Sequence, residues 1–261
     1  MEQIRLNKFL AERIGVSRRE ADILIQNKKV KINDKIAELG THIDKNDKVW
    51  YNGKIIPFDT DYLYIAFNKP VGYVCSRRAQ GSAPTIYDLL PKEYNKLKSV
   101  GRLDKDSSGL ILLTNDGDFA FEMTHPKFHK EKIYEVELDR PLEPLHQQMI
   151  SDYGIMLDDG PSKFLIIHED DKYIVKLNEG RNRQIRRTFA ALGYKVTKLH
   201  RTSFGVYQLN NLASGRYQLI NKNWNGIHFH FNFQSKFLLL DFSLQRKVHY
   251  ARIKVWALFW G

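Results

Sequence analysis

The stretch 101-GRLDKDSSGLILLTNDG-117 joins a polar, glycine-bounded turn to the apolar run Leu110–Leu113. Because the run is short, continuous and enclosed by turn residues, it predicts a buried strand. The turn in front of it carries Asp104, Asp106 and Ser108. A carboxylate held in this way at the mouth of a sheet is a candidate for metal binding or for catalysis.

Three chemical interpretations compete for this turn. Asp104, Asp106 and Ser108 have the spacing of an EF-hand calcium loop, but the twelfth position, where a bidentate glutamate is needed, is Asn115. A Mg²⁺-binding aspartate of a nucleotide hydrolase would need a phosphate loop of the GxxxxGK[ST] kind, which this sequence lacks. In the third interpretation Asp104 is a metal-free catalytic carboxylate, acting as nucleophile or base toward a sugar or a base ring.

A cationic partner for such a carboxylate is available in 178-NEGRNRQIRR-187, at the start of a predicted helix. The arginines of this stretch are Arg181, Arg183, Arg186 and Arg187. A guanidinium placed against Asp104 would keep the carboxylate charged and orient it bidentately, which a lysine would do less well. The sequence does not decide which arginine takes this position.

Composition limits the class of protein further. With 261 residues, 43% of them hydrophobic, the chain can bury a substantial core and suits one small and one medium domain. The formal charge of +11 implies a polyanionic partner, most simply a phosphate backbone. A single cysteine, Cys75, excludes an internal disulfide and a cysteine-built zinc site. Without a signal-like N-terminus or an apolar stretch of about 20 residues, we expect a cytoplasmic protein that does not enter a membrane.

The first 58 residues predict two helices followed by short strands. Apolar residues from Leu6 to Ile14 keep helical spacing, and Gly15 follows at a plausible helix end. Ser17 and Glu20 have the spacing of a capping box that starts a second helix. Asn52-Gly53 is a favoured two-residue hairpin turn between short strands.

The remaining chain is predicted to be α+β. We expect residues 59–62 to form a linker, residues 63–226 a larger domain, and residues 227–261 a separate extension. Predicted strands of the larger domain are Leu63–Phe67, Leu110–Leu113, Lys132–Leu138, Phe164–His168 and Tyr173–Leu177. Predicted helices are Phe119–Thr124, Pro144–Tyr153 and Asn182–Leu192. Because no strand–helix unit repeats, a parallel doubly wound sheet is not expected.

The N-terminal sequence RLNKFLAERIGVSRREADILIQNKKVKIND resembles the S4 RNA-binding domain over about 50 residues. The resemblance implies that the helix pair and the following turn bind structured RNA through its shape and phosphates. The basic residues expected to contact RNA are Arg5, Lys8, Arg18 and Arg19. This chain has Lys29 in the place where that domain usually has a glycine before the strand.

Three further stretches together resemble the bacterial ribosomal-RNA pseudouridine synthases that join an S4 domain to a catalytic domain. They are 68-NKPVGYVCS-76, the opening stretch at 101–117, and EGRNRQIRR with LGYKVTKLHRTSFG between 179 and 205. The resemblance covers nearly all of residues 1–226 in the expected order. It implies a catalytic domain with a mainly antiparallel mixed sheet flanked by helices.

The same resemblance assigns roles to individual residues. Asp104 matches the catalytic aspartate, and Arg102 the arginine that fills the gap left in RNA when the target uridine is extruded. Tyr134 matches the catalytic-site tyrosine that stacks on the flipped base and can act as a base. Ile185 matches an apolar pocket residue, and Arg186 the arginine paired with the catalytic carboxylate. Three neighbouring arginines, Arg181, Arg183 and Arg187, would then be RNA contacts.

The implied reaction isomerises uridine to pseudouridine in ribosomal RNA, and it requires the base to leave the stack. We expect no metal, redox cofactor or nucleotide cosubstrate, activity in the presence of a chelator, and a monomer. The motifs favour large-subunit (23S) over small-subunit (16S) ribosomal RNA. Two other classes stay open: a non-catalytic S4-type RNA-binding or assembly factor, and a metal-dependent RNA hydrolase. For residues 227–261, whose aromatic and basic residues could bind RNA or form an added hairpin, we expect no function.

Overall fold

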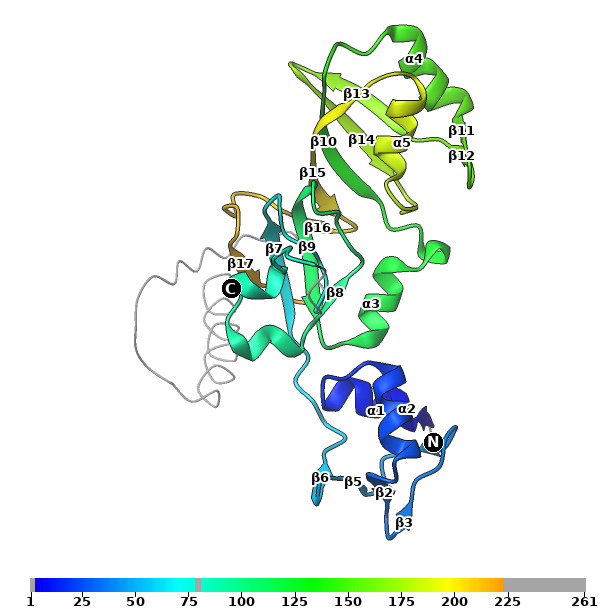
Figure 1. Cartoon of the computed structure of the whole chain (residues 1–261), viewed down its shortest axis with the longest axis vertical. Helices are drawn as coiled ribbons and strands as arrows, with labels where there is room; N and C mark the ends of the chain where they lie inside the picture. The colour runs from blue at the N-terminus through cyan, green and yellow to red at the C-terminus, as the bar shows by residue number, and fades with distance from the viewer. Residues whose placement is uncertain (1–2, 78–80, 223–261) are drawn as a thin grey trace, which may run out of the picture. The chain divides into compact units, whose positions relative to one another are not determined.

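The computed structural model describes residues 3–77 and 81–222 of the chain (Figure 1). These residues combine helices with predominantly antiparallel strands, so the expected α+β class is confirmed. None of the helices formed by the described residues is long and apolar enough to cross a membrane. The extension expected at residues 227–261 lies outside the described residues.

The N-terminal domain consists of two helices and two small sheets. Its helices are Leu6–Arg13 (α1) and Arg18–Gln26 (α2). Its strands are Ile4–Arg5 (β1), Val30–Ile32 (β2), Lys35–Ile36 (β3), His42–Ile43 (β4), Val49–Tyr51 (β5) and Lys54–Ile56 (β6). β1 pairs with β4, and the other four strands form a sheet in the order β3-β2-β5-β6.

The local signals in this domain act as the sequence predicts. The Ser17 hydroxyl accepts a hydrogen bond from the Glu20 backbone N–H, and the Glu20 carboxylate accepts one from the Ser17 N–H, so the capping box is confirmed. Asn52 and Gly53 both have positive φ and connect β5 to β6 as expected. The left-handed residue before β2 is Lys28, with φ 55°, and not Lys29, where the sequence suggested the missing glycine.

The second domain is built on one nine-stranded sheet. The strand order is β13-β14-β10-β15-β9-β7-β17, with β8 added to β9 and β16 added to β15. These strands are Tyr64–Lys69 (β7), Lys98–Val100 (β8), Ser108–Thr114 (β9), Lys132–Leu138 (β10), Leu165–Glu169 (β13), Lys172–Leu177 (β14), Val196–Phe204 (β15), Tyr207–Gln208 (β16) and Tyr217–Leu219 (β17). A separate hairpin joins Ile155–Leu157 (β11) to Gly160–Ser162 (β12).

Helices complete this domain. The α-helices are Gly117–Thr124 (α3), Pro144–Gln148 (α4) and Gln184–Ala191 (α5), and a π-helical turn at Met149–Tyr153 (η4) continues α4. Short 3₁₀ helices are Ile86–Leu89 (η1), Lys92–Lys96 (η2) and Pro126–Phe128 (η3). The predicted helix Pro144–Tyr153 therefore exists as an α-helical and a π-helical part.

Both faces of the sheet are covered by apolar clusters. Ile185 and Phe189 of α5 pack in one cluster with Tyr134 and Val136 of β10. Phe119 of α3 lies in the cluster on the other face of the sheet. β9 is buried from Gly109 to Thr114 because it lies between these two layers, which explains why its sequence is continuously apolar.

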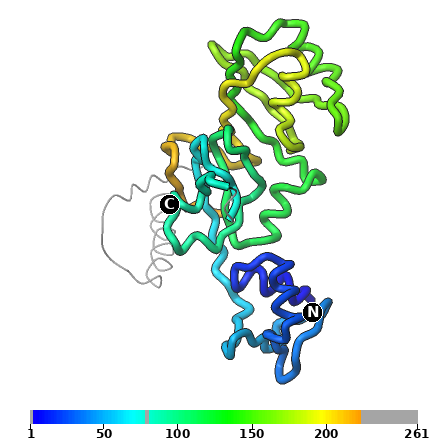
Figure 2. The backbone as a smooth tube through the Cα atoms, viewed as in Figure 1, coloured from blue at the N-terminus to red at the C-terminus, as the bar shows by residue number. Residues whose placement is uncertain are grey.

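The expected strands are present, and strand β10 has the predicted bounds. Strand β15 was not predicted, although it lies in the middle of the sheet. It pairs antiparallel with β10 and parallel with β9. Figure 2 shows the course of the backbone through this domain, coloured by residue number. The β9–β15 pair is parallel whereas the other strand pairs of this sheet are antiparallel, so the sheet is mixed and mainly antiparallel as expected.

Candidate active site

The turn that carries Asp104 is held by its own backbone and by a second loop. The Ser107 N–H donates to the Asp104 carbonyl at 3.1 Å, which closes the turn directly before β9. The Gly72 N–H donates to the Lys105 carbonyl at 2.7 Å. The Asp104 side chain is one-third exposed, so the carboxylate is fixed at its base and accessible at its tip.

Lys69, at the end of β7, binds the backbone of the turn that carries Asp104. Its side chain is fully buried, and its ammonium donates to the Ser107 carbonyl at 2.6 Å and to the Pro70 carbonyl at 3.0 Å. Burial lowers the pKa of Lys69 to about 8. A buried ammonium that binds two carbonyls fixes the path of the backbone on both sides of the site.

Four residues from four strands lie in one row across the sheet at this point. Lys69 of β7 pairs with Gly109 of β9, Gly109 with Arg201 of β15, and Arg201 with Tyr134 of β10. In β9 the row passes through Gly109, the second residue of the strand, which closely follows the turn that carries Asp104. The topology therefore brings Tyr134 and Asp104 to the same end of the sheet.

Gly109 makes this row possible because it has no side chain. A Cβ atom at this position would lie 2.3 Å from the Arg201 carbonyl oxygen and 2.5 Å from its nitrogen. Its φ of +106° is also a conformation that other residues rarely adopt. The parallel contact between β9 and β15 therefore depends on glycine.

Two arginines of the α5 region bind the turn. Arg183 donates to both carboxylate oxygens of Asp106 at 2.9 Å, and its Nη1 lies 3.6 Å from Asp104 Oδ2. Arg186 donates to the Asp106 carbonyl at 2.8 Å and to the Val196 carbonyl at 2.9 Å. The hydrogen bond from Arg183 lowers the pKa of the Asp106 carboxyl.

The expected pairing of Arg186 with Asp104 is corrected by this geometry. Among the described residues, the ion pair of Asp104 is made by Arg183, which precedes α5 in a left-handed conformation with φ 47°. Arg186 lies one helical turn further on and reaches the backbone of the turn and the Asp106 carboxylate, with Nε 3.4 Å from Oδ2. Asp106 is therefore the acid that connects both arginines to the turn.

Arg181 and Arg187, which the resemblance assigns to RNA contacts, both pair with Asp159 in the structure. Arg187 makes a bidentate pair with Asp159, at 3.1 and 2.7 Å, and Arg181 Nη1 lies 3.0 Å from the same carboxylate. Arg181 also donates to the carbonyls of Gly160 and Pro161. The two guanidinium groups compensate Asp159 and attach the β11–β12 hairpin to the loop before α5.

Tyr134 and Ile185 lie in the same apolar cluster as Leu103, the residue before Asp104. The Arg201 guanidinium is buried, donates to the Leu110 carbonyl at 2.7 Å and lies 6.0 Å from the centre of the Tyr134 ring. Its Nη2 has no hydrogen-bond partner within the described part of the chain. The apolar cluster thus meets a cation and the Asp104 turn in one place.

Arg102 is exposed and belongs to the same turn as Asp104. Among the described residues, the Asp106 carboxylate pairs with Arg183 and Arg186 and forms no salt bridge with Arg102. The calcium interpretation also fails, because Asn115 lies beyond the far end of β9 and bonds to Asp61 and Leu63.

The basic residues expected to bind RNA in the N-terminal domain differ in their surroundings. Arg5, Arg18 and Arg19 are exposed, and Arg18 donates to the Asn7 side chain at 3.3 Å. Lys8 instead forms a salt bridge with Asp118 at 2.6 Å, which compensates its charge within the protein.

The site contains two residues that the sequence did not single out, Lys69 and Arg201. Lys69 stands in the quoted stretch 68-NKPVGYVCS-76, and Arg201 stands in the quoted stretch LGYKVTKLHRTSFG, but neither residue was given a role. For Lys69 the available signal was a lysine that follows an apolar strand, whereas the strand of Arg201 carries further basic and polar residues and gave no such signal. Cys75 and His200, to which no chemistry was assigned, form local contacts with Leu103 and Ser108.

We expect Lys69 to make protein stability depend on pH. Its pKa is about 8 in the folded protein, against an ordinary value of 10.5. Between these values the unfolded chain binds more protons than the folded protein, so the free energy of unfolding rises with pH. Compared with Lys69→Met, the wild type should gain roughly 1 to 2 kcal/mol between about pH 7 and pH 9.5. Urea unfolding of both proteins at the two pH values measures this difference, and a constant difference would contradict the expectation.

Substitutions can distinguish the role of Arg183 from that of Arg186. Arg183→Gln should reduce activity by about ten- to a hundred-fold with little loss of stability, because its exposed side chain orients Asp104. Arg186→Gln should also lower the free energy of unfolding by roughly 2 to 3 kcal/mol, because two carbonyl groups lose their donors. Equal loss of stability in both variants, measured by urea unfolding, would contradict this division of roles.

Comparison with known proteins agrees with the fold. Residues 63–191 match the family model for RNA pseudouridylate synthase, and residues 4–49 match the model for the S4 domain. A solved structure described as pseudouridylate synthase superposes with a TM-score of 0.61 at 35% identity, covering 84% of this chain and 96% of that one. The chain belongs to the RNA pseudouridylate synthase family and carries an S4 domain.

Relatives of two kinds are similar to this chain. The ribosomal small subunit pseudouridine synthase A of Pasteurella multocida is 39% identical over 82% of this chain and 95% of the relative. The ribosomal large subunit pseudouridine synthase B of Bacillus subtilis is 34% identical over 81% and 89%. The protein is therefore an enzyme of the pseudouridine synthase type.

Proposed function

We propose that this protein converts a specific uridine of ribosomal RNA to pseudouridine, with Asp104 as the catalytic carboxylate. The observation that carries the proposal is the position of Asp104. Its accessible carboxylate lies 3.6 Å from the Arg183 guanidinium, in a turn fixed by the buried Lys69. The similarity to enzymes named as ribosomal pseudouridine synthases supports ribosomal RNA as the substrate.

The reaction defines what each group has to do. The C1′–N1 bond breaks, the uracil ring turns, a C1′–C5 bond forms, the C5 proton leaves and N1 takes up a proton. A carboxylate near the sugar and the ring can serve as nucleophile or base in this sequence. Tyr134 and Ile185 would contact the extruded base, and Arg102, exposed beside the carboxylate, would occupy the space that the base leaves. Extruding a base costs a few kcal/mol, which these contacts and phosphate contacts offset.

We further propose a division of the chain that follows this function. Residues 1–58 bind RNA, residues 59–62 connect, and residues 63–226 carry out the chemistry. Arg5, Arg18 and Arg19 are exposed on the first domain and available to phosphates. Because its substrate is ribosomal RNA, the enzyme would act in the cytoplasm.

Two substrates fit the proposal. The motifs GRLDKDS and EGRNRQIRR favour the large-subunit RNA, whereas identity over the whole length is higher to the small-subunit enzyme, 39% against 34%. Purified protein incubated with full-length transcripts of each RNA decides between them.

Transcripts labelled with tritium at uracil C5 give a direct readout, because forming the C1′–C5 bond releases that hydrogen to water. We expect release from one of the two RNAs, at a single uridine when pseudouridine is mapped, with and without a chelator. Binding without release from either RNA would point to a non-catalytic RNA-binding factor. Chelator-sensitive strand cleavage would point to a hydrolase.

A further inference from the structure

Within the described residues, one face of the N-terminal sheet packs in an apolar cluster and the other face does not. Val30, Val49 and Ile56 point to the helices and are buried in their apolar cluster. Since side chains alternate along a strand, Lys31 of β2 and Trp50 of β5 lie on the opposite face. These two residues are direct cross-strand partners.

The row through Lys31 and Trp50 continues across the whole four-stranded sheet. Lys31 pairs with Ile36 of β3 on one side, and Trp50 pairs with Ile55 of β6 on the other. Ile36 and Ile55 are 51% and 49% exposed, respectively. The outer face thus presents an aromatic ring and two apolar side chains next to a cation.

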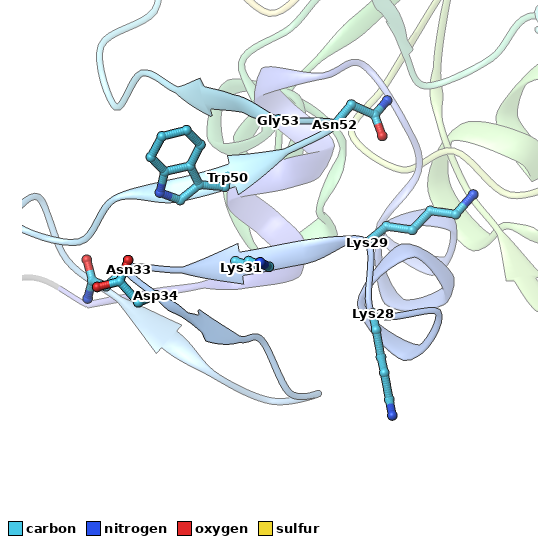
Figure 3. A pocket seen from close by; sticks show the side chains of 8 residues that line it. All are labelled: Lys28, Lys29, Lys31, Asn33, Asp34, Trp50, Asn52 and Gly53. Atoms are coloured by element: carbon cyan, nitrogen blue, oxygen red, sulfur yellow. The ribbon is translucent and has the colours of Figure 1, made fainter.

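This face is hollowed around the tryptophan. A hollow of about 360 Å³ is lined by residues that include Lys28, Lys29, Lys31, Asp34, Trp50 and Asn52 (Figure 3). Lys28 and Lys29 stand before β2, and Asn52 stands at the turn that ends β5. An aromatic ring that lines such a hollow can be contacted by another flat ring.

The charge of the hollow is unbalanced. The residues that line it carry three ammonium groups, those of Lys28, Lys29 and Lys31, and one carboxylate, that of Asp34. Within residues 3–77 and 81–222, Lys28, Lys29 and Lys31 are exposed and form no salt bridge. Asn33, by contrast, is occupied by hydrogen bonds to Lys48 and Asp47. The hollow therefore has free cations and an aromatic surface, which are the two components of sites for single-stranded nucleic acid.

Lys28 supplies an independent observation. It adopts the left-handed conformation, φ 55°, which costs a lysine free energy that a glycine would not lose. Lys28 therefore places a charge beside the hollow, although glycine at this position would give the folded protein a higher free energy of unfolding. Unfavourable backbone conformations of this kind are concentrated at functional sites.

We propose that the hollow binds an unpaired nucleotide of the RNA substrate. We name the part formed by Lys28, Lys29, Lys31 and Trp50 the Trp50 face. The base stacks on the indole of Trp50, and the flanking phosphates contact Lys28, Lys29 and Lys31. A nucleotide within a duplex cannot take this position, because its faces are covered by neighbouring bases. The three free ammonium groups favour this occupant over an apolar segment of another protein. The inference takes RNA as the partner from the proposed function and adds a contact separate from the basic helices.

The test uses the full chain and two labelled probes, a single-stranded 12-nucleotide oligoadenylate and a 12-base-pair RNA duplex. Trp50→Ala should weaken binding of the single strand by about five- to a hundred-fold, the range expected for loss of one stacked base. Trp50→Phe, which keeps a ring, should lose far less. Ile55→Ala is the matched control, because Ile55 lies on the same face of the sheet but does not line the hollow, and it should bind as the wild type does. Fluorescence anisotropy measures all four proteins.

Two results would overturn the proposal. One is unchanged single-strand affinity in Trp50→Ala. The other is an equal loss of affinity for the duplex, which would indicate a general defect. Circular dichroism and thermal unfolding of each variant confirm that the domain remains folded, which is expected because Trp50 lies on the outer face.

Lys28→Gly provides a second test, in which thermal stability should rise while affinity for the single strand should fall. The variant should unfold at a temperature a few degrees higher, because the left-handed strain is relieved. It should also bind the single strand more weakly, and the slope of log affinity against log salt should fall by about 0.7. Lys28→Arg keeps the charge and should keep the slope. An unchanged slope in Lys28→Gly would remove the lysine from the proposed site.

One experiment distinguishes failure of the Trp50 face from failure of the proposed enzymatic function. Pseudouridine formation is measured for wild type and for Trp50→Ala on the same transcripts. If the wild type forms no pseudouridine but Trp50→Ala binds single strands weakly, the proposed function fails and the Trp50 face stands. If pseudouridine forms and Trp50→Ala binds single strands as the wild type does, the Trp50 face fails alone.

Discussion

Replacing Asp104 with asparagine should lower pseudouridine formation by at least about a thousand-fold, because the amide cannot act as nucleophile or base. The substitution preserves the size of the side chain and the backbone hydrogen bond from Ser107 to the Asp104 carbonyl. Stability should change little, since the side chain is one-third exposed. Tritium release from C5-labelled transcripts measures the rate, and urea unfolding measures stability.

Asp106→Asn is the matched control for this experiment. It removes the same charge two residues away, from the carboxylate that binds Arg183 and Arg186. We expect a partial loss of activity together with a loss of stability, because the arginines lose their partner but Asp104 remains. If Asp106→Asn were the inactive variant and Asp104→Asn retained activity, the assignment of the catalytic carboxylate would be wrong.

The fold could be predicted where the local pattern agrees with the final environment. β10 alternates buried and partly buried residues, and β9 is a continuous apolar run, so both strands follow from their sequences. β15 was missed because its sequence, VTKLHRTSF, carries three basic or ionisable side chains. Arg201 is nevertheless buried in the centre of the sheet, where a carbonyl of β9 accepts its hydrogen bond. Only the tertiary structure supplies that partner.

The arginine partners could not be predicted for a related reason. Counting charges along residues 174–201 gives a strongly basic segment, because the acids that compensate it come from elsewhere in the chain. Asp106 lies 77 residues before Arg183, and Asp159 lies 28 residues before Arg187. A guanidinium that seems free for RNA in the sequence is paired in the fold. The presence of a cation beside Asp104 was predictable, but the identity of that arginine was not.

Gly109→Ala should have the largest effect on stability, with a loss of about 4 kcal/mol or more in the free energy of unfolding. The new Cβ would lie 2.3 Å from the Arg201 carbonyl oxygen, and backbone atoms cannot rotate away as a side chain can. Relief would require β9 and β15 to separate at their parallel contact. The turn that carries Asp104 ends directly before this contact. Separation of the strands should therefore also displace Asp104 and abolish activity. Urea unfolding and tritium release measure both effects.

Gly72→Ala separates the steric effect from the conformational one. Gly72 also has positive φ, +94°, but a Cβ there would meet no atom within 4 Å. This variant should therefore lose only about 1 to 2 kcal/mol, from backbone strain alone. If both variants lost the same free energy, the close approach of β15 would not be the cause. A much larger loss in Gly109→Ala would show that the parallel strand contact, and not the left-handed backbone, makes glycine necessary beside the catalytic turn.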